Sequence, residues 1–295
     1  MIKKLFCLLF FVSRITCSLG QTTDLARIEY TYAPQSSSDN SFRRFRTFLN
    51  FPIPIAEDDY LVAGIEYRNI NILLKDDLPF NNEGFERYQS FKFTVGYTAK
   101  MKNDWRYAIK AETIIASDFS RRINGDDFIY GGSLFFIKDR TGGDEVKNVK
   151  KPWRIILGAT YGTNAGRPFP LPIINYFRKM HPNWSYTLGV PKTNLKYYIT
   201  DKHILQGFVT LDGFFANIQE DINLPNNKAG STISMTTVLS GMGYEYLFTK
   251  NLLFYFYGGH TLINDIRLRN DNADDVLTLN DANTFYLRSG IKFKI

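Results

Sequence analysis

The last thirteen residues of the chain, 283–295, alternate between two kinds of side chain without a break. One face of an extended strand would carry Phe285, Leu287, Ser289, Ile291, Phe293 and Ile295, and the other Tyr286, Arg288, Gly290, Lys292 and Lys294. Such period-two alternation is typical of a β-strand with one apolar face. Because about 9 to 11 tilted residues cross the bilayer in a membrane β-barrel, this segment favours that class of fold.

The start of the chain has the pattern of a secretory signal peptide. Lys3 and Lys4 precede an apolar run over residues 5–12, and small residues follow at Ser18 and Gly20. The run is about half as long as a transmembrane helix requires, which disfavours a membrane anchor. We therefore expect export of the chain and cleavage after Gly20.

Both cysteines, Cys7 and Cys17, lie in this expected leader, residues 1–20. Lipid attachment at Cys17 is an alternative, although residues 14–16 form an unfavourable context for it. The expected mature chain, one domain over 21–295, would contain no cysteine. A disulfide framework, a thiol nucleophile and a cysteine-ligated metal are then excluded.

Composition favours an all-β protein and disfavours nucleic acid as a partner. Aromatic residues make up 16% of the chain, while the mean hydropathy is slightly negative. That combination is expected when apolar residues alternate with polar ones. Of the 36 basic residues, Lys3, Lys4 and Arg14 fall in the leader, which leaves 33 against 29 acidic ones. No run of five or six like charges is present.

Period-two stretches recur from the forties to the C-terminus, and no segment after the leader has the apolar stripe of an amphipathic helix. Strands are predicted at residues 45–55, 61–67, 88–101, 105–115, 128–137, 153–161, 184–190, 195–199, 204–215, 233–248, 252–266 and 283–295. We expect an antiparallel up-and-down transmembrane β-barrel of about 12–14 strands.

The connections between these strands alternate in length. Short turns are expected at residues 56–58, 102–104, 201–203 and 249–251. Long polar loops are expected at 75–87, 117–127, 140–151, 220–231 and 270–282. Outer-membrane barrels have short turns at one end and long loops at the other.

A soluble β-barrel or β-sandwich would show the same alternation, with its apolar face turned inward. The leader, the strand count and aromatic residues at strand ends favour lipid on the outside; these aromatics are Tyr60, Trp105, Trp153 and Trp184. The expected location is the outer membrane. The expected partners are outer-membrane lipid and, through the C-terminal strand, the barrel-assembly machinery.

Residues 167–172 interrupt the pattern, with prolines at 168, 170 and 172. Proline has no amide N–H to donate to a sheet, and residues two apart in a strand point their backbone groups to the same side. This segment is therefore predicted to be an extended edge or a piece of chain inside the barrel.

The region around these prolines resembles an uncharacterised family of outer-membrane β-barrel proteins from Gram-negative bacteria. The resemblance rests on a Pro-x-Pro-ϕ-ϕ-x-Tyr stretch at 170–176, Trp184, a Leu-Gly-ϕ-Pro turn at 188–191 and a Leu-x-Tyr strand at 195–197. Asn175 stands where many family members have glycine. The resemblance implies an outer-membrane barrel and no established activity, so it assigns no functional residue.

No residues form a specific catalytic or metal-binding motif. The three histidines, His181, His203 and His260, stand in no Asn-x-His or Gly-x-Ser-x-Gly setting. We predict that His260 is a hydrogen-bonded lumen residue and that the other two lie in turns. Aspartate pairs occur at 58–59, 76–77, 126–127 and 274–275, but without the Asp-x-Asp-x-Asp-Gly pattern of a calcium loop. We expect no enzyme, metal or cofactor.

The polar registers of the clear strands predict a charged interior. These residues are Arg44, Arg46, Glu66, Arg68, Lys92, Arg106, Lys110, Glu112, Arg154, Lys196, Arg288 and Lys292. In an open lumen they would favour anionic or polar solutes. In a closed lumen they would form an internal salt-bridge network completed by acidic loop residues. Both alternatives remain open.

The expected function is a passive one, either a narrow channel for small polar or anionic solutes or a structural membrane role. A lipid-modifying enzyme, with His260 as its best candidate base, is one alternative. A surface-binding barrel that acts through its long loops is another.

Overall fold

The computed structural model describes residues 24–35, 40–73, 78–80, 85–141, 151–225 and 228–294. Its strands are β1 (Asp24–Pro34), β2 (Ser41–Ala56), β3 (Asp59–Leu73), β4 (Arg87–Lys100), β5 (Trp105–Ser117), β6 (Phe128–Arg140), β7 (Trp153–Gly162), β8 (Phe169–His181), β9 (Trp184–Gly189), β10 (Lys192–Tyr198), β11 (His203–Leu224), β12 (Lys228–Leu247), β13 (Leu252–Arg269), β14 (Asp275–Asn280) and β15 (Phe285–Lys294). Short 3-10 helices are η2 (Lys102–Asp104), η3 (Gly125–Asp127) and η5 (Thr163–Ala165). The expected leader, 1–20, lies outside the described residues.

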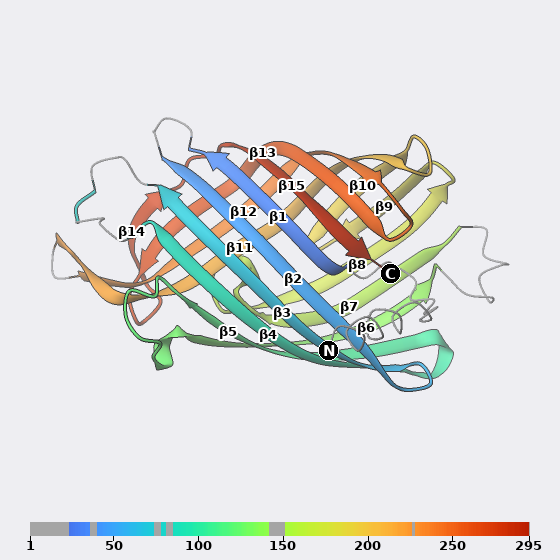
Figure 1. Ribbon diagram of the computed structural model, residues 1–295, viewed down its shortest axis with the longest axis horizontal. Coiled ribbons are helices and arrows are strands. Elements are labelled where there is room, and N and C mark those ends of the chain that lie inside the picture. The colour runs from blue at the N-terminus through green and yellow to red at the C-terminus, as the bar shows by residue number, and fades with distance from the viewer. Residues whose placement is uncertain are drawn as a thin grey trace, which may run out of the picture.

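Fourteen of the described strands form one closed antiparallel barrel, tilted against its long axis (Figure 1). From β1 to β13 each strand pairs with the next in the chain, and β15 pairs with both β13 and β1. β14 is a short addition to β13 within the β13–β15 connection. The all-β class, the up-and-down order and the expected strand number are confirmed. None of the described helices is long and apolar enough to cross a bilayer.

Two strands of the barrel wall, β1 and β8, were not predicted. In β1 the exposed Ile28 and Tyr30 alternate with the buried Glu29 and Thr31, so the signal was present directly after the leader. β8 contains the prolines, which argued against a strand. The other twelve wall strands were predicted, and each predicted strand overlaps an observed one.

The two ends of the barrel differ in their connections. The short turns predicted at 56–58, 102–104, 201–203 and 249–251 all lie at the end where β1 begins and β15 ends. The predicted loop 140–151 connects β6 to β7 and therefore belongs to the same end, contrary to expectation. The predicted loop 220–231 is wrong for most of its length, because β11 continues to Leu224 and β12 begins at Lys228.

The outer face of the wall is apolar and the inner face is not. In β15 the side chains of Phe285, Leu287, Ile291 and Phe293 are exposed, whereas that of Tyr286 is buried inside the barrel. The aromatic residues Trp105, Trp153 and Trp184 begin β5, β7 and β9 at the short-turn end. Tyr60, the second residue of β3, lies at the same end but faces inward, where the Arg106 guanidinium lies 5.8 Å from its ring centre.

The second half of β11 and the first half of β12 bend away from the wall and into the lumen. We call residues 211–224 of β11 and 228–238 of β12 the inner ribbon. Asn217 of this ribbon pairs with Ser117 of β5, a strand that is not its neighbour in the wall. The Phe214 ring lies 6.1 Å from that of Tyr88 in β4. Register shifts at Val238 in β12 mark the bend, as β-bulges commonly do.

The inner ribbon fills the half of the barrel away from the short turns with an apolar core. This core includes Ile70, Ile72, Tyr88, Ile114, Phe214, Ile233, Met235, Ile266 and Leu268, all buried. Side chains on the ribbon pack against side chains on β3, β4 and β5. The lumen is therefore closed at this level by packed hydrocarbon.

The prolines of β8 lie on an unpaired edge. β8 pairs with β7 from Phe169 to Arg178, but its pairing with β9 begins only at Asn175. The Val190 N–H donates to Ile174 O over 2.9 Å, so the even-numbered residues of β8 direct their backbone groups toward β9. Pro170 and Pro172 have the same direction and lie beyond the paired part. The predicted extended edge is confirmed, and the alternative of a segment inside the barrel is wrong.

Candidate functional site

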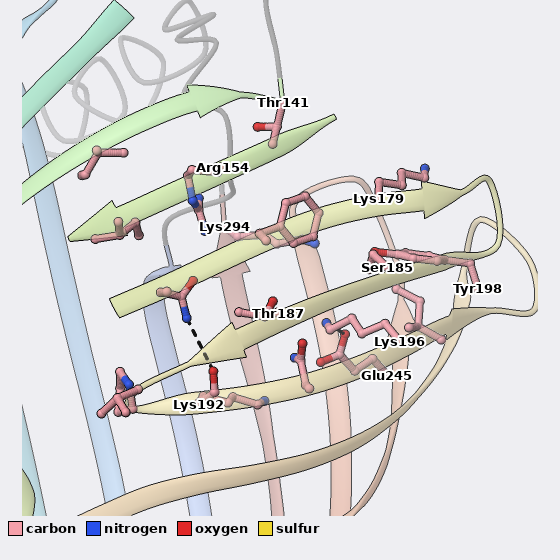
Figure 2. Close-up of a pocket in the computed structure, with 18 of the residues that line it drawn as sticks. Thr141, Arg154, Lys179, Ser185, Thr187, Lys192, Lys196, Tyr198, Glu245 and Lys294 are labelled. Carbon is pink, nitrogen blue, oxygen red and sulfur yellow. Dashed lines mark hydrogen bonds and ion pairs between the residues drawn. The ribbon is translucent and has the colours of Figure 1, made fainter. Parts of the chain in front are cut away.

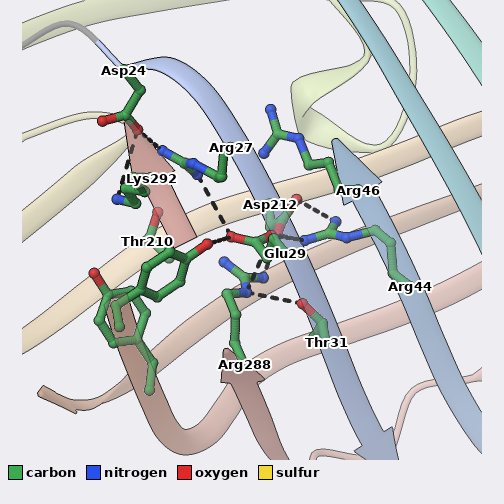
Figure 3. Close-up of polar contacts among 12 residues, drawn as sticks. Asp24, Arg27, Glu29, Thr31, Arg44, Arg46, Thr210, Asp212, Arg288 and Lys292 are labelled. Atoms are coloured by element: carbon green, nitrogen blue, oxygen red, sulfur yellow. Dashed lines mark hydrogen bonds and ion pairs between the residues drawn. The ribbon is translucent and has the colours of Figure 1, made fainter. Parts of the chain in front are cut away.

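An ion-pair cluster spans the lumen near its middle (Figure 3). Arg44 of β2 donates to both carboxylate oxygens of Asp212 on the inner ribbon, over 2.9 and 2.8 Å. Arg288 of β15 donates to the same carboxylate over 2.7 Å. Glu29 of β1 lies 3.4 Å from Arg44 and 3.7 Å from Arg288. We call Glu29, Arg44, Asp212 and Arg288 the crossing cluster, because it ties the ribbon to the opposite wall.

The crossing cluster is enclosed by further hydrogen bonds. The Tyr255 hydroxyl donates to Glu29 over 2.6 Å, and Arg288 donates to the Thr31 hydroxyl over 3.0 Å. Arg44 and Glu29 are almost fully buried. Within these four residues two guanidinium groups balance two carboxylates, and the Arg27 guanidinium, which pairs with Asp24, also lies 3.6 Å from Glu29.

A second network runs along the inner face of β2 to β5. It contains Arg46, Glu66, Arg68, Lys92, Lys110 and Glu112. Glu66 pairs with Arg68 and, over 2.8 Å, with Arg46, and Lys110 lies 2.9 Å from Glu112. Arg68 also donates to Gly213 O of the inner ribbon over 3.3 Å. This network fixes one side of the lumen.

The twelve residues predicted for the lumen all lie on inner registers, but in separate places. Arg44 and Arg288 belong to the crossing cluster, and six more belong to the network of β2 to β5. Arg106 donates to Asp58 O at the short-turn rim, and Lys292 lies 3.7 Å from Asp24. The remaining two, Arg154 and Lys196, line a cavity.

The acidic partners differ from the prediction. Loop residues were expected to complete the ion pairs, but Glu29, Asp212 and Glu245 come from strands β1, β11 and β12. Glu29 was missed along with β1. Asp212 and Glu245 lie inside predicted strands, and following the alternation through those strands would have assigned both to the inner face.

A cavity of about 770 Å³ lies in the half of the barrel near the short turns (Figure 2). It is lined by residues of β6 to β12 and by Lys294 of β15. Thr141, Asp201 and Lys294, which lie at the short-turn end, form part of the lining. The cavity therefore extends to that end of the barrel.

Cationic side chains outnumber anionic ones around this cavity. Arg154, Lys179, Lys192, Lys196 and Lys294 face Asp201 and Glu245. Glu245 is occupied by Lys196 at 2.6 Å and by the Gln206 amide and Tyr257 hydroxyl. Among the described residues, no carboxylate oxygen lies within 4.0 Å of the ammonium groups of Lys179, Lys192 or Lys294. The cavity thus holds an excess of positive charge.

Its innermost cation is Lys192. The Lys192 ammonium donates to Gln206 Oε1 over 3.2 Å and lies 4.8 Å from the Phe208 ring centre and 5.3 Å from that of Tyr257. The Asn175 side-chain amide, on β8, donates to the backbone oxygen of Lys192 over 3.5 Å. An anion that reached this depth would meet a cation already partly stripped of water.

The histidines are placed elsewhere. His260 hydrogen-bonds Thr261 O over 2.7 Å, as expected of a bonded residue, but it packs against the exposed Phe285 ring on the outer face, so its predicted lumen position is wrong. His181, predicted to lie in a turn, is instead the last residue of β8, and its ring accepts from the Asn183 N–H of the following turn. His203 begins β11 next to a turn and bonds the Tyr244 hydroxyl over 2.6 Å.

A family model described as "Domain of unknown function (DUF6268)" matches residues 81–294. No curated protein sequence matches the chain. Among solved structures, the NanC porin is 12% identical, with 92% of this chain and all of that chain covered at a TM-score of 0.38. The TodX monoaromatic hydrocarbon channel, as a deletion mutant, is 8% identical, with 91% and 88% covered at 0.41. Outer membrane phospholipase A from Escherichia coli is 10% identical, with 92% and 98% covered at 0.37.

Proposed function

Since this chain belongs to the DUF6268 family, a domain of unknown function, we propose a function from its own residues: an outer-membrane barrel that admits small anionic solutes to its basic cavity. The apolar outer face, the tryptophans at the short-turn end and the closed ring support the membrane location. Outer-membrane lipid would surround the wall, and β15 would present its apolar face to the assembly machinery.

The excess of cations in the cavity carries this proposal. Of the five cationic side chains that line it, Lys196 is paired with Glu245 and Arg154 lies 3.9 Å from Asp139, whereas among the described residues Lys179, Lys192 and Lys294 have no carboxylate oxygen within 4.0 Å. In a region of low dielectric constant an unpaired cation attracts an anion strongly. A cavity of about 770 Å³ is large enough for a small organic solute.

Passage beyond the cavity would require the inner ribbon to move. In the structure the crossing cluster and the apolar core close the lumen between the cavity and the far end. In this state the barrel would bind solutes in a cavity that opens at the short-turn end. A conducting state would form when Asp212 leaves Arg44 and Arg288.

Planar-bilayer recording tests whether the ribbon must move, with a reducible disulfide that fixes the ribbon to the wall. Ser117 and Asn217 are paired across β5 and β11, within the Cα separation that a disulfide bridges. We expect brief, anion-selective openings in the wild type, silence in oxidised Ser117→Cys/Asn217→Cys protein, and recovery after reduction. Asn69→Cys/Gln89→Cys joins two neighbouring wall strands and is the matched control, which should conduct in both redox states.

A second variant separates gating from solute binding. Asp212→Asn removes the charge that holds both arginines, and should lengthen the openings severalfold. Equal conductance of the disulfide variant in its oxidised and reduced forms would show that the ribbon does not control passage. Cation-selective openings, or no binding of any anion to the purified barrel, would overturn the proposed function.

A further inference from the structure

We propose that the cavity selects amphipathic anions, meaning a carboxylate or similar group on an aliphatic or aromatic body, over small hydrophilic ones. This inference rests on the proposed function and names the solute class for the same cavity. It follows from the unequal chemistry of the cavity's two sides (Figure 2).

One side of the cavity carries most of its large apolar side chains, with Arg154, Asn175 and Lys179 as the polar residues on the same strands. β6, β7 and β8 contribute Phe135, Ile137, Ile156, Ile173 and Phe177 to the lining. The lumen of a channel for sugars or inorganic ions is normally polar. Five large hydrocarbon side chains on adjacent strands instead form a surface from which water is released when an apolar group covers it.

The opposite side is polar and basic. β9 and β10 contribute Ser185, Thr187, Lys192, Asn194 and Lys196 to the same lining. Lys196 is neutralised by Glu245, whereas among the described residues Lys192 has an amide and two aromatic rings as its neighbours. Lys192 is therefore the cation on this side that remains available to an anionic group.

The two sides meet at the deep end of the cavity. Val190 and Pro191, at the tip of the β9–β10 hairpin, line the cavity next to Lys192, and the Val190 N–H bonds Ile174 of β8. A solute whose anionic group reached Lys192 would lay its body along Ile173 and Ile156. A bare inorganic anion could use the lysine but would leave the hydrocarbon in contact with water.

Binding of a carboxylate series tests the inference. We would measure equilibrium binding of acetate, butyrate, hexanoate and octanoate to the full barrel in lipid nanodiscs, with empty nanodiscs subtracted for partitioning. Each added methylene should tighten binding about fourfold while the chain still contacts the apolar side. Octanamide has the same body without the charge and should bind at least tenfold more weakly than octanoate.

Matched variants locate the effect. Ile173→Asn, or Ile156→Thr should the first not fold, ought to remove the chain-length dependence while acetate binding persists. Ile174→Asn changes the next residue of β8, which is exposed on the outer face, and should leave the series unchanged. Lys192→Gln should weaken every carboxylate and leave octanamide unaffected.

The outcomes separate this inference from the proposed function. If acetate and octanoate bind equally and both depend on Lys192, the anion cavity stands and amphipathic selectivity is wrong. If octanamide binds as tightly as octanoate, the site is merely apolar and the inference is overturned. If no carboxylate binds, the proposed function itself fails.

Discussion

At the scale of single residues, Asp212 connects the inner ribbon to two strands of the opposite wall. Its two oxygens accept from arginines on β2 and β15, which hold the inner ribbon against the far wall. Glu29 completes the charge balance at Arg44 and Arg288. A buried group of this kind is sensitive to the loss of one member, because the remaining charges cannot regain water.

We expect Glu29→Gln to destabilise the folded barrel by about 3 kcal/mol, because it leaves Arg44 and Arg288 to share one carboxylate. Glu220→Gln is the control: Glu220 pairs with Arg121 at 2.7 Å, but both side chains are more than half exposed, so the cost should stay below about 1 kcal/mol. Urea unfolding in lipid vesicles measures both. Equal losses would mean that the crossing cluster contributes little to stability.

A second residue links stability to pH. Asp127 lies in η3, beyond the strand ends, where burial raises the pKa of its carboxyl but hydrogen bonds lower it further, so that its net pKa lies below the usual value. The donors are the Asn217 amide at 2.9 Å, the Asn124 N–H at 2.9 Å and the Gln219 amide at 2.7 Å. These bonds join the β5–β6 connection to the end of the inner ribbon.

Because the folded-state pKa of Asp127 is lowered, its stabilising contribution is complete above the unfolded pKa of about 3.9 and disappears as the pH falls through the folded value. We expect Asp127→Asn to be less stable than the wild type at pH 7, with the difference shrinking below about pH 4. Unfolding midpoints at several pH values measure this. A difference independent of pH would show that the charge of Asp127 is not involved.

At the scale of elements, β8 shows how prolines can protect the unpaired edge of a strand. Pro170 and Pro172 direct no N–H toward the side where β9 is missing. An exposed strand edge with unpaired amides invites another strand, and inside a membrane such amides are costly. The prolines remove the donors that would cause both problems.

Restoring those donors tests their role. In the double variant Pro170→Ala/Pro172→Ala, two amide N–H groups would point from the edge, and we expect a several-fold increase in crosslinked dimers together with a lower unfolding midpoint. Pro182→Ala, in the β8–β9 turn, is the control and should remain monomeric to the same extent as the wild type. Unchanged crosslinking of the double variant would mean that the edge is already covered.

Alternation could predict most of the wall because each strand needs an apolar face toward lipid and a different one inside. It identified Phe285 and Leu287 as outward residues and Arg288 as an inward one, all confirmed. The inner ribbon could not be found in this way. Phe214 and Met235 satisfy the same period-two pattern whether their strand stays in the wall or bends inward, and only contacts with distant strands decide.

At the scale of the whole molecule, the charged interior divides into a fixed part and an available part. The sequence predicted twelve charged residues for the lumen but could not choose between an open and a closed barrel. Ten of them pair within the crossing cluster, the β2 to β5 network or the rims, and the two that reach the cavity, Arg154 and Lys196, have Asp139 and Glu245 as their partners. The other cavity cations, Lys179, Lys192 and Lys294, were not among the predicted residues. Lys179 follows the prolines on β8, a strand that the sequence did not predict.

The pairing of β1 with β15 has a consequence for how the chain can be reconnected. Asp24 lies opposite Lys294 at the short-turn end, so the first and last described strands are neighbours like any others. A circular permutant that joins them through a short linker and opens at residues 249–251 should therefore fold to the same wall. Heat-modifiable migration on gels, compared with a permutant opened within β12, would check this. Success of the first alone would show that the barrel's ring order, rather than its starting residue, specifies the fold.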